Sequence, residues 1–439
     1  MSKRHSIVIL AVVLFVGLGR ARAQDNNVPD PWLQAIGAVP TLVDSPLVVD
    51  LRGLAGYDSN VFNDNRSHSV APLFEPGVHA AWLQESSMER EHAILSYDGQ
   101  ALVYPGRQYA DHAYQAAALD FDDRLTPRWD LHMRGGGFYQ TGVFFFSSAA
   151  QPVSVVSTPE NPSVITPNAH EWSDQARVDL SYRLGPLGSL GVFARYSRRR
   201  YSHITDAAAL YNSSTYELGG SYVRRVSRSW WIGPTVSAQR LSFGSVAMAN
   251  LFTMDWSASW HASPIWTFTG FVGGQHLSMQ QQLAEQSNGA VVSVGLLQSH
   301  WHSQFGGSVQ REWSWIRAAI SAQRAVTDGG GLLTTVVNTY EQVLLTIPTT
   351  PDAMLAWKLS LIASHGQSSS LAPGLSQGIL RDDRVRVMAQ RWLSDRWSIR
   401  LVDEFGRQRA IGLPRYSNAT RNIFSVGVAF RLFGPPGEL

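Results

Sequence analysis

The chain has 439 residues with 36 basic and 34 acidic side chains, so no basic surplus is available for a nucleic-acid surface. Cysteine is absent, and an exported chain of this length must then be held by burial and backbone pairing without disulfides. A hydrophobic content of 44% is too low for a helical membrane protein, whereas a β-barrel hides its lipid face in alternate residues.

The first 23 residues have the layout of a secretory signal peptide. Lys3 and Arg4 precede an apolar run at positions 7–18, and Ala21-Arg22-Ala23 provides an A-x-A cleavage site. The run is shorter than the roughly 20 apolar residues that cross a bilayer as a helix. Cleavage would leave 32 basic residues against 34 acids, a balance of −2. We therefore expect an exported chain that begins at Gln24.

The rest of the chain is predicted to contain one domain with a short extension at each end. Residues 24–45 are polar and proline-containing, which favours a short periplasmic segment. Residues 46–433 show no interior boundary and are assigned to a single barrel. Residues 434–439 contain Pro435-Pro436, which cannot continue a strand, so we expect a periplasmic tail there.

Alternating apolar and polar residues predict an all-β chain of about eighteen strands. Phe252, Met254 and Trp256, for example, alternate with Thr253 and Asp255, as expected for a strand with one apolar face. In chain order we predict strands at 46–57, 70–84, 90–103, 112–124, 128–144, 169–184, 188–201, 210–226, 229–243, 248–262, 265–279, 299–312, 315–327, 333–347, 352–366, 378–393, 395–409 and 421–433. Sixteen strands is the alternative, because 299–312 and the region before it are ambiguous.

The predicted connections alternate between short and long. Short links lie near Ser87, Pro127, Pro186, Ser227 and, further on, near positions 264, 314, 351 and 395, whereas longer links include 58–69, 145–168 and 280–298. Outer-membrane barrels have short periplasmic turns and long external loops, a sorting that a soluble sheet does not need. The pattern favours a transmembrane antiparallel β-barrel with both chain ends in the periplasm. A soluble exported β-sandwich that binds a ligand is the structural alternative.

Aromatic residues gather beside the predicted turns. Trp230, Trp266 and Trp397 flank short links, while Tyr104 and Tyr139 lie toward long ones. Tyrosine and tryptophan favour membrane interfaces because one part of each ring system is apolar and the other is polar. The distribution predicts two aromatic girdles, although core packing in a soluble β-protein would also use such residues.

The last predicted strand, 421–433, carries the clearest membrane signal. Its alternation places phenylalanine, valine and leucine side chains on one face and small or polar side chains on the other. It also resembles the terminal signal read by the bacterial barrel-assembly machinery, through Ser425, Gly427, Phe430, Leu432 and Phe433. We predict that this strand pairs with 46–57 and closes the barrel, with Arg431 pointing into the lumen.

Charged residues on the polar faces of the strands are candidates for lining a water-filled lumen. They are Asp50, Arg52, Asp98, Asp120, Asp122, Arg177, Asp179, Arg183, Arg195, Arg199, Glu217, Arg317, Arg384, Arg386, Arg400 and Arg431. Acids are concentrated in early strands and arginines in later ones. Opposed walls of this kind would set a field across the pore and favour anions or acidic sugars. The alternative is that these charges pair across neighbouring strands.

No enzyme signature dominates the chain, and we predict that it is not an enzyme. One alternative is an outer-membrane lipid hydrolase, because His276-Leu277-Ser278 places a base and a hydroxyl on one face of a strand. His300 and His302 also share a face, but two imidazoles without a nearby carboxylate do not predict a metal site. We predict no metal and no cofactor.

Residues 56–62 read Gly-Tyr-Asp-Ser-Asn-Val-Phe. This element resembles the Gly-Tyr-Asp-x-Asn-Val-Phe motif of a family of bacterial outer-membrane β-barrel porins that is often associated with exopolysaccharide loci. The resemblance implies a barrel in the bacterial outer membrane that passes polar solutes or helps to export polysaccharide. The partners expected from this reading are outer-membrane lipid, the barrel-assembly machinery and the transported solute or polysaccharide. The sequence does not indicate an oligomeric state.

Overall fold

The computed structural model describes residues 47–61, 69–85, 91–107, 111–141, 170–202, 210–244, 247–287, 290–313, 316–329, 333–347, 357–371, 378–412 and 418–433. The predicted signal peptide, the 24–45 segment and the 434–439 tail lie outside these residues. A helix long and apolar enough to cross a membrane is not found in the described part of the chain.

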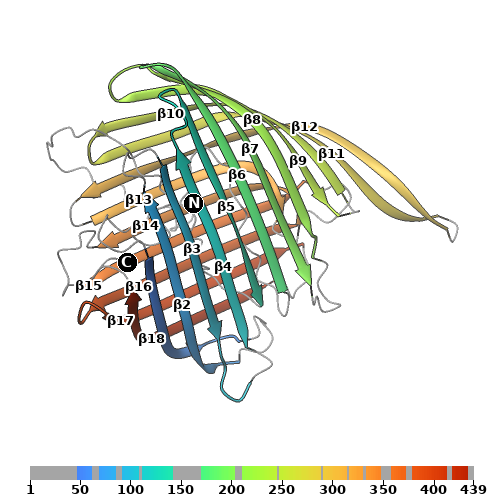
Figure 1. Ribbon diagram of the computed structural model, residues 1–439. Helices are drawn as coiled ribbons and strands as arrows, with labels where there is room; N and C mark the ends of the chain where they lie inside the picture. The colour runs from blue at the N-terminus through green and yellow to red at the C-terminus, as the bar shows by residue number, and fades with distance from the viewer. Residues whose placement is uncertain are drawn as a thin grey trace, which may run out of the picture.

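Eighteen antiparallel strands form one sheet that closes on itself (Figure 1). They are β1 (Leu47–Asp58), β2 (Ala71–Glu85), β3 (Glu91–Leu102), β4 (His112–Asp123), β5 (Trp129–Thr141), β6 (His170–Gly185), β7 (Gly188–Ser202), β8 (Ser213–Arg225), β9 (Trp230–Phe243), β10 (Ala247–Ser263), β11 (Trp266–Ser287), β12 (Ala290–Trp313), β13 (Ile316–Gly329), β14 (Leu333–Ile347), β15 (Trp357–Ser370), β16 (Ile379–Trp392), β17 (Trp397–Ile411) and β18 (Ala419–Phe433). Each strand pairs with its neighbours in sequence, and β1 also pairs with β18. The predicted barrel and its strand count of eighteen are confirmed.

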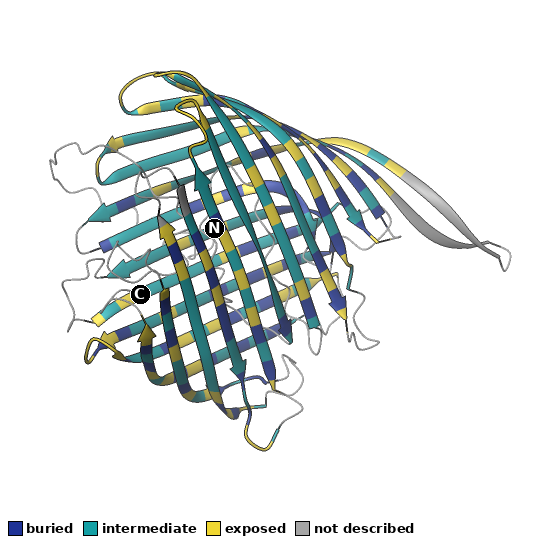
Figure 2. Cartoon of the chain, viewed as in Figure 1, coloured by how far each residue is buried: buried dark blue, intermediate teal, exposed yellow. Residues whose placement is uncertain are grey.

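The two faces of the wall differ in chemistry, as the alternation predicted. In β18, Phe424, Val426 and Val428 are exposed on the outer face, whereas Ser425 and Arg431 are about 1% exposed on the inner face. Figure 2 shows this alternation of exposure along many of the strands. In a closed barrel, neighbouring strands satisfy each other's backbone hydrogen-bonding groups. The apolar outer face presents hydrocarbon to lipid, so this fold belongs in the bacterial outer membrane.

Short turns gather at one end of the barrel. Pro186 and Leu187 alone join β6 to β7, whereas the link between β5 and β6 at the other end spans 142–169. We assign the short-turn end to the periplasm. Outward-facing rings stack near this end: the centroids of Trp230 and Trp260 are 5.3 Å apart, and those of Trp260 and Phe268 are 5.0 Å apart. This is the position expected for a periplasmic girdle.

The seam between β1 and β18 requires glycine. A Cβ atom on Gly56 would lie 1.8 Å from the carbonyl oxygen of Phe424, and one on Gly427 would lie 2.0 Å from that of Gly53. The register places Gly56 opposite Ser425 and Leu54 opposite Gly427. Two positions, one in the 56–62 motif and one in the terminal signal, therefore let the first and last strands approach closely.

Residues 56–61 of the motif form the extracellular end of this seam. Asp58 Oδ1 accepts a hydrogen bond of 2.8 Å from the Asn60 backbone N–H, a local turn that aspartate favours. The Asn60 side chain then donates to the carbonyl oxygen of Thr420 at 2.8 Å, and the backbone N–H of Ser59 donates to that of Asn422 at 2.9 Å. The motif residues therefore fasten the start of the barrel to its last strand.

The link between β11 and β12 differs from the prediction. A loop was expected at 280–298, but both strands continue through this region and pair as far as Ser287 and Ala290. The sequence there contains Val291, Val292 and Val294, which suit strands, and the prediction overlooked them. Because β12 pairs with β13 only from Phe305 to Trp313, the rest of the hairpin extends away from the barrel wall (Figure 1).

Candidate functional site

The strand register places all of the predicted pore-lining residues on the inner face. Asp98 and Asp120 are buried there, whereas Arg183 near the periplasmic end is half exposed. The register brings residues from neighbouring strands into rows, so Arg134, Arg177, Arg195 and Glu217 lie side by side across β5 to β8. Their role in lining a conducting pore stays a prediction.

Charges of opposite sign are interleaved on the inner face, and the predicted segregation into acidic and basic walls is wrong. The Nε atom of Arg431 in β18 lies 3.1 Å from Asp50 Oδ1 in β1, and both side chains are almost fully buried. Also on the inner face, Arg52 Nη2 in β1 lies 3.0 Å from Asp98 Oδ1 in β3. Closure of the barrel explains the first pair, because it makes β1 a neighbour of β18, whereas the second pair lies within the early strands.

The late strands contain their own acidic partners. Arg386 in β16 is 3.1 Å from Glu404 in β17, and Arg384 is 2.8 Å from Asp382 two residues away. Arg317 in β13 is likewise 3.1 Å from Glu312 in β12. Local pairing of this kind cancels most of the field that isolated arginines would create.

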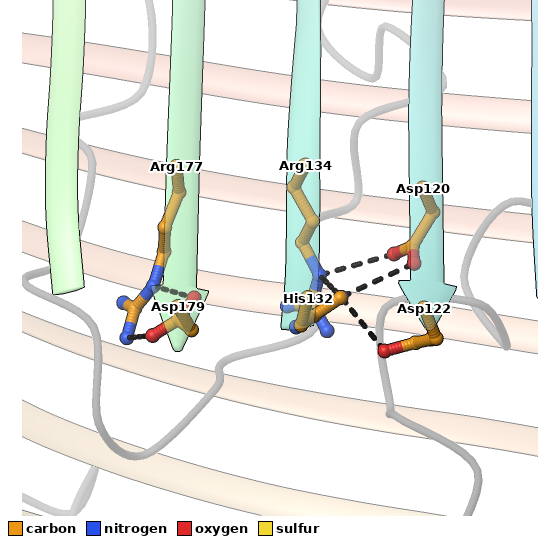
Figure 3. Close-up of polar contacts among 6 residues, drawn as sticks. All are labelled: Asp120, Asp122, His132, Arg134, Arg177 and Asp179. Carbon is orange, nitrogen blue, oxygen red and sulfur yellow. Dashed lines mark hydrogen bonds and ion pairs between the residues drawn. The ribbon is translucent and has the colours of Figure 1, made fainter. Parts of the chain in front are cut away.

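A second charged network lies on β4, β5 and β6 (Figure 3). Arg134 donates through Nε to Asp120 Oδ2 at 3.0 Å, and His132 Nε2 lies 3.2 Å from Asp120 Oδ1. On β6, Arg177 forms two bonds of 2.7 Å with Asp179. Because Asp120 is 1% exposed, its carboxylate depends on these partners for stabilisation.

Three groups in this network have a spacing that could suit a cation. Potential ligand atoms of Asp120, Asp122 and His132 all lie within 4.8 Å of one another. However, Arg134 Nε donates to both Asp120 and His132 Nε2, so a fixed positive charge already contacts two of the three ligands. The arrangement is that of an ion-pair cluster and does not call for a metal.

A contact across the lumen narrows the extracellular end of the barrel. Asp328 at the end of β13 accepts a 3.0 Å hydrogen bond from the hydroxyl of Ser213 in β8 and lies 3.9 Å from Arg199 in β7. Arg199 also lies 3.0 Å from Glu171 in β6. In the sheet, β13 is separated from β8 by four strands, so these contacts join distant parts of the wall. We call Asp328, Ser213, Arg199 and Glu171 the cross-lumen bridge.

Apolar packing supports the cross-lumen bridge. Val326 and Val337, near the extracellular ends of β13 and β14, pack with inward-facing Leu241, Leu251 and Leu277 of β9 to β11. The backbone N–H of Val326 also donates to the Gln275 side chain at 2.6 Å. This contact becomes available because the β11–β12 hairpin leaves the wall above Phe305, which frees the upper edge of β13.

A buried triad fixes the extracellular end of the seam. Arg421 and Asp58 are fully buried, with Arg421 Nη2 2.5 Å from Asp58 Oδ2. The Tyr104 hydroxyl, in the loop after β3, donates to the same carboxylate oxygen at 2.6 Å and accepts from Arg421 at 2.7 Å. Burial raises the pKa of Tyr104, which keeps the hydroxyl protonated and able to donate.

The sequence-based prediction missed several of these residues, although many of them lie an even number of positions from an inward-facing residue of the same strand. His132 and Arg134 alternate along β5 as pore-lining residues should, and Arg421 is in phase with Arg431. Glu171 is in phase with Arg177 and contacts Arg199 of the adjacent strand β7. For Asp328, period-two alternation gave no reason to expect contact with Arg199, because the upper end of β13 reaches β7 only where it no longer pairs with β12.

The His-x-Ser pair lies on the outer face of β11, as its phase predicted. The hydroxyl that His276 contacts is that of Ser299 in β12, 2.9 Å from its Nε2 atom, rather than that of Ser278. The predicted nucleophile pair is therefore not assembled among the described residues. The absence of enzymatic activity itself stays a prediction.

No protein-family profile matches the sequence, and no curated protein matches it either. Solved structures with a similar fold include OpdL of Pseudomonas aeruginosa, at 10% identity and a TM-score of 0.39, covering 89% of this chain and 100% of that one. The siderophore receptor PirA of the same organism has 9% identity and a TM-score of 0.39, with coverages of 90% and 81%. The ferric-catecholate import receptor Fiu of Escherichia coli, in its open form, has 8% identity, a TM-score of 0.43 and coverages of 90% and 82%. Similarity this low supports no inference about activity.

Proposed function

We propose that this chain is an outer-membrane channel for polar solutes. The observation that carries the proposal is the inner face: a closed wall of eighteen strands whose inward residues are largely polar and whose charges are arranged in short-range pairs. Paired charges offer hydrogen-bonding groups to a passing solute without a strong preference for one ion sign. Small sugars and zwitterions suit such a wall better than a single class of ion.

The cross-lumen bridge is proposed to restrict passage at the extracellular end. Its ion pairs and hydrogen bonds are weak enough individually to open on the timescale of transport, and the packing of Val326 and Val337 limits how far they open. Replacing Asp328 by alanine removes the acceptor for Ser213 and the partner of Arg199. We expect the D328A channel to be wider and to open more often.

Single-channel recording in planar lipid bilayers tests both statements. Wild type is expected to conduct with a reversal potential close to zero in a salt gradient, and D328A to show a severalfold greater mean conductance at unchanged selectivity. The matched control is D383A, because the Asp383 carboxylate contacts His365 outside the cross-lumen bridge. A strong preference for cations or anions would contradict the paired-charge argument, and an absence of conductance from both proteins would contradict the channel itself.

Export of exopolysaccharide is the narrower form of this function that the 56–62 motif implies. The motif residues Asp58 and Asn60 hold the seam, so their presence is explained by barrel closure without a role in polysaccharide contact. The narrower proposal needs its own test. Deleting the gene and measuring surface polysaccharide would support export if polysaccharide were lost and restored by complementation, and would oppose it if the amount were unchanged.

A further inference from the structure

A groove on the outer face of the barrel crosses β6 to β11 and has a volume of ≈ 670 Å³. One row of outward-facing residues, aligned across the strands by their register, lines much of this groove. Across the strands this row contains Val178, Ala194, Leu218, Ala238 and Phe252. Large and small side chains alternate in it, with Leu218 67% exposed and Phe252 46% exposed. The two alanines are therefore low points of the groove, and we call the one over Ala238, between Leu218 and Phe252, the furrow.

The furrow over Ala238 ends at a positively charged group. Arg240, two residues further along β9 toward the extracellular end, lies between Tyr216 of β8 and Asn250 of β10 in the next row. Its guanidinium is exposed and contacts the sulfur of Met248 at 2.9 Å. Among the described residues no carboxylate meets it, so its charge is available to an external anion.

The surroundings of Arg240 add to this positive charge. On the same outer edge, Arg198 is paired with Asp174 at 3.0 Å, while Arg200 is exposed one row further out. Among the described residues of β6 to β10, the outward-facing charges at this edge are thus three arginines against one aspartate. Tyr196 and Tyr216, whose rings are 5.0 Å apart, mark the height of the membrane interface beside them.

We propose that this groove binds a phosphorylated acyl lipid of the outer leaflet, of the lipid A class. One acyl chain lies in the furrow over Ala238, between Leu218 and Phe252, where it buries apolar surface on both partners. The phosphate meets Arg240, whose planar fork matches phosphate geometry, and the side chains of Tyr216 and Asn250 supply further hydrogen bonds. The site is independent of conduction, because it lies on the opposite face of the wall from the lumen.

Binding of lipid A to the full-length protein in detergent tests the proposal, with retained lipid counted by native mass spectrometry. Arg240→Gln removes the charge and Ala238→Trp fills the furrow, and each is expected to weaken binding about tenfold. Lipid A from which the phosphates have been removed is expected to bind the wild type as weakly as lipid A binds Arg240→Gln.

Matched controls separate this site from general lipid contact. Arg391→Gln changes an exposed, outward-facing arginine at the periplasmic end of β16, and Ala389→Trp enlarges an outward-facing alanine on the same strand outside the groove. Both should bind lipid A like wild type, and the folded barrel can be verified in every variant by heat-modifiable gel mobility. Equal loss in the controls, wild-type binding in both groove variants, or no preference for phosphorylated lipid would overturn the proposal.

Discussion

At the scale of single residues, the described charges of the lumen work mainly in pairs. Asp50 with Arg431 and Asp58 with Arg421 show the strongest case, because both pairs are buried and both join β1 to β18. A buried ion pair gives modest net stability, yet removing one partner is costly because the other charge is left without compensation. The sequence located Asp50 and Arg431 through alternation but could not show that they touch, because 381 positions separate them.

Replacing Asp58 by asparagine should destabilise the barrel strongly. The change leaves the fully buried guanidinium of Arg421 without a negative partner and weakens the acceptor for Tyr104, at a cost of about 3–5 kcal/mol. Unfolding in guanidinium chloride, followed by gel mobility without boiling, measures the effect. Asp130→Asn is the control: its partner Arg183 is half exposed, so about 0–1 kcal/mol is expected. Equal shifts in the two variants would refute the argument from burial.

At the scale of elements, the strands were predicted well and one hairpin was not. Period-two alternation located β1 to β10 and β13 to β18 to within a few residues, because each of these strands has one apolar face toward lipid. The segment at 280–298 instead continues β11 and β12, which pair with each other beyond the wall. A hairpin that leaves the barrel does not need the lipid-facing pattern on which the prediction depended.

Closure of the seam depends on glycine at position 56. In Gly56→Val, the new Cβ would lie 1.8 Å from the carbonyl oxygen of Phe424, which is too close for any side chain. Strands β1 and β18 should then fail to pair, and the amount of folded protein should fall below a tenth of the wild-type amount. Gly53→Ala, in the same strand, is the control because its Cβ would meet only Phe74 at 3.7 Å. Outer-membrane fractionation with the heat-modifiability assay reports the result. Normal assembly of Gly56→Val would show that the seam is not this tight.

At the scale of the whole molecule, the described inner face is a mixture of charges and the outer face is divided by height. Closure of the barrel brings acidic and basic residues together, since β1 pairs with β18. The strands β1 to β3 and β16 to β18 therefore form one part of the wall although they lie at opposite ends of the chain. On the outer face, stacked tryptophans lie near the short turns, and the separation of short turns from long links gives the barrel a direction. That direction places the groove over β6 to β11 in the outer leaflet.

The absence of native cysteine makes the orientation directly testable. Pro105→Cys lies in an exposed turn at the end assigned to the outside, and Arg228→Cys lies in an exposed short turn at the periplasmic end. A membrane-impermeant maleimide should label the first variant in intact cells and the second only after the outer membrane is permeabilised. The reverse pattern would invert the assignment and remove the groove from the outer leaflet.

The sequence by itself determined the class of fold, the approximate number of strands, the lipid-facing residues and the pairing of the first strand with the last. These follow from local alternation and from the need of a membrane barrel to leave no free edge. The tertiary structure alone decided which charges pair, that Asp328 reaches Arg199 and Ser213, and that the small side chain of Ala238 leaves a furrow next to Arg240. Such contacts depend on strand register and on the curvature of the wall, and residue alternation contains no information about either.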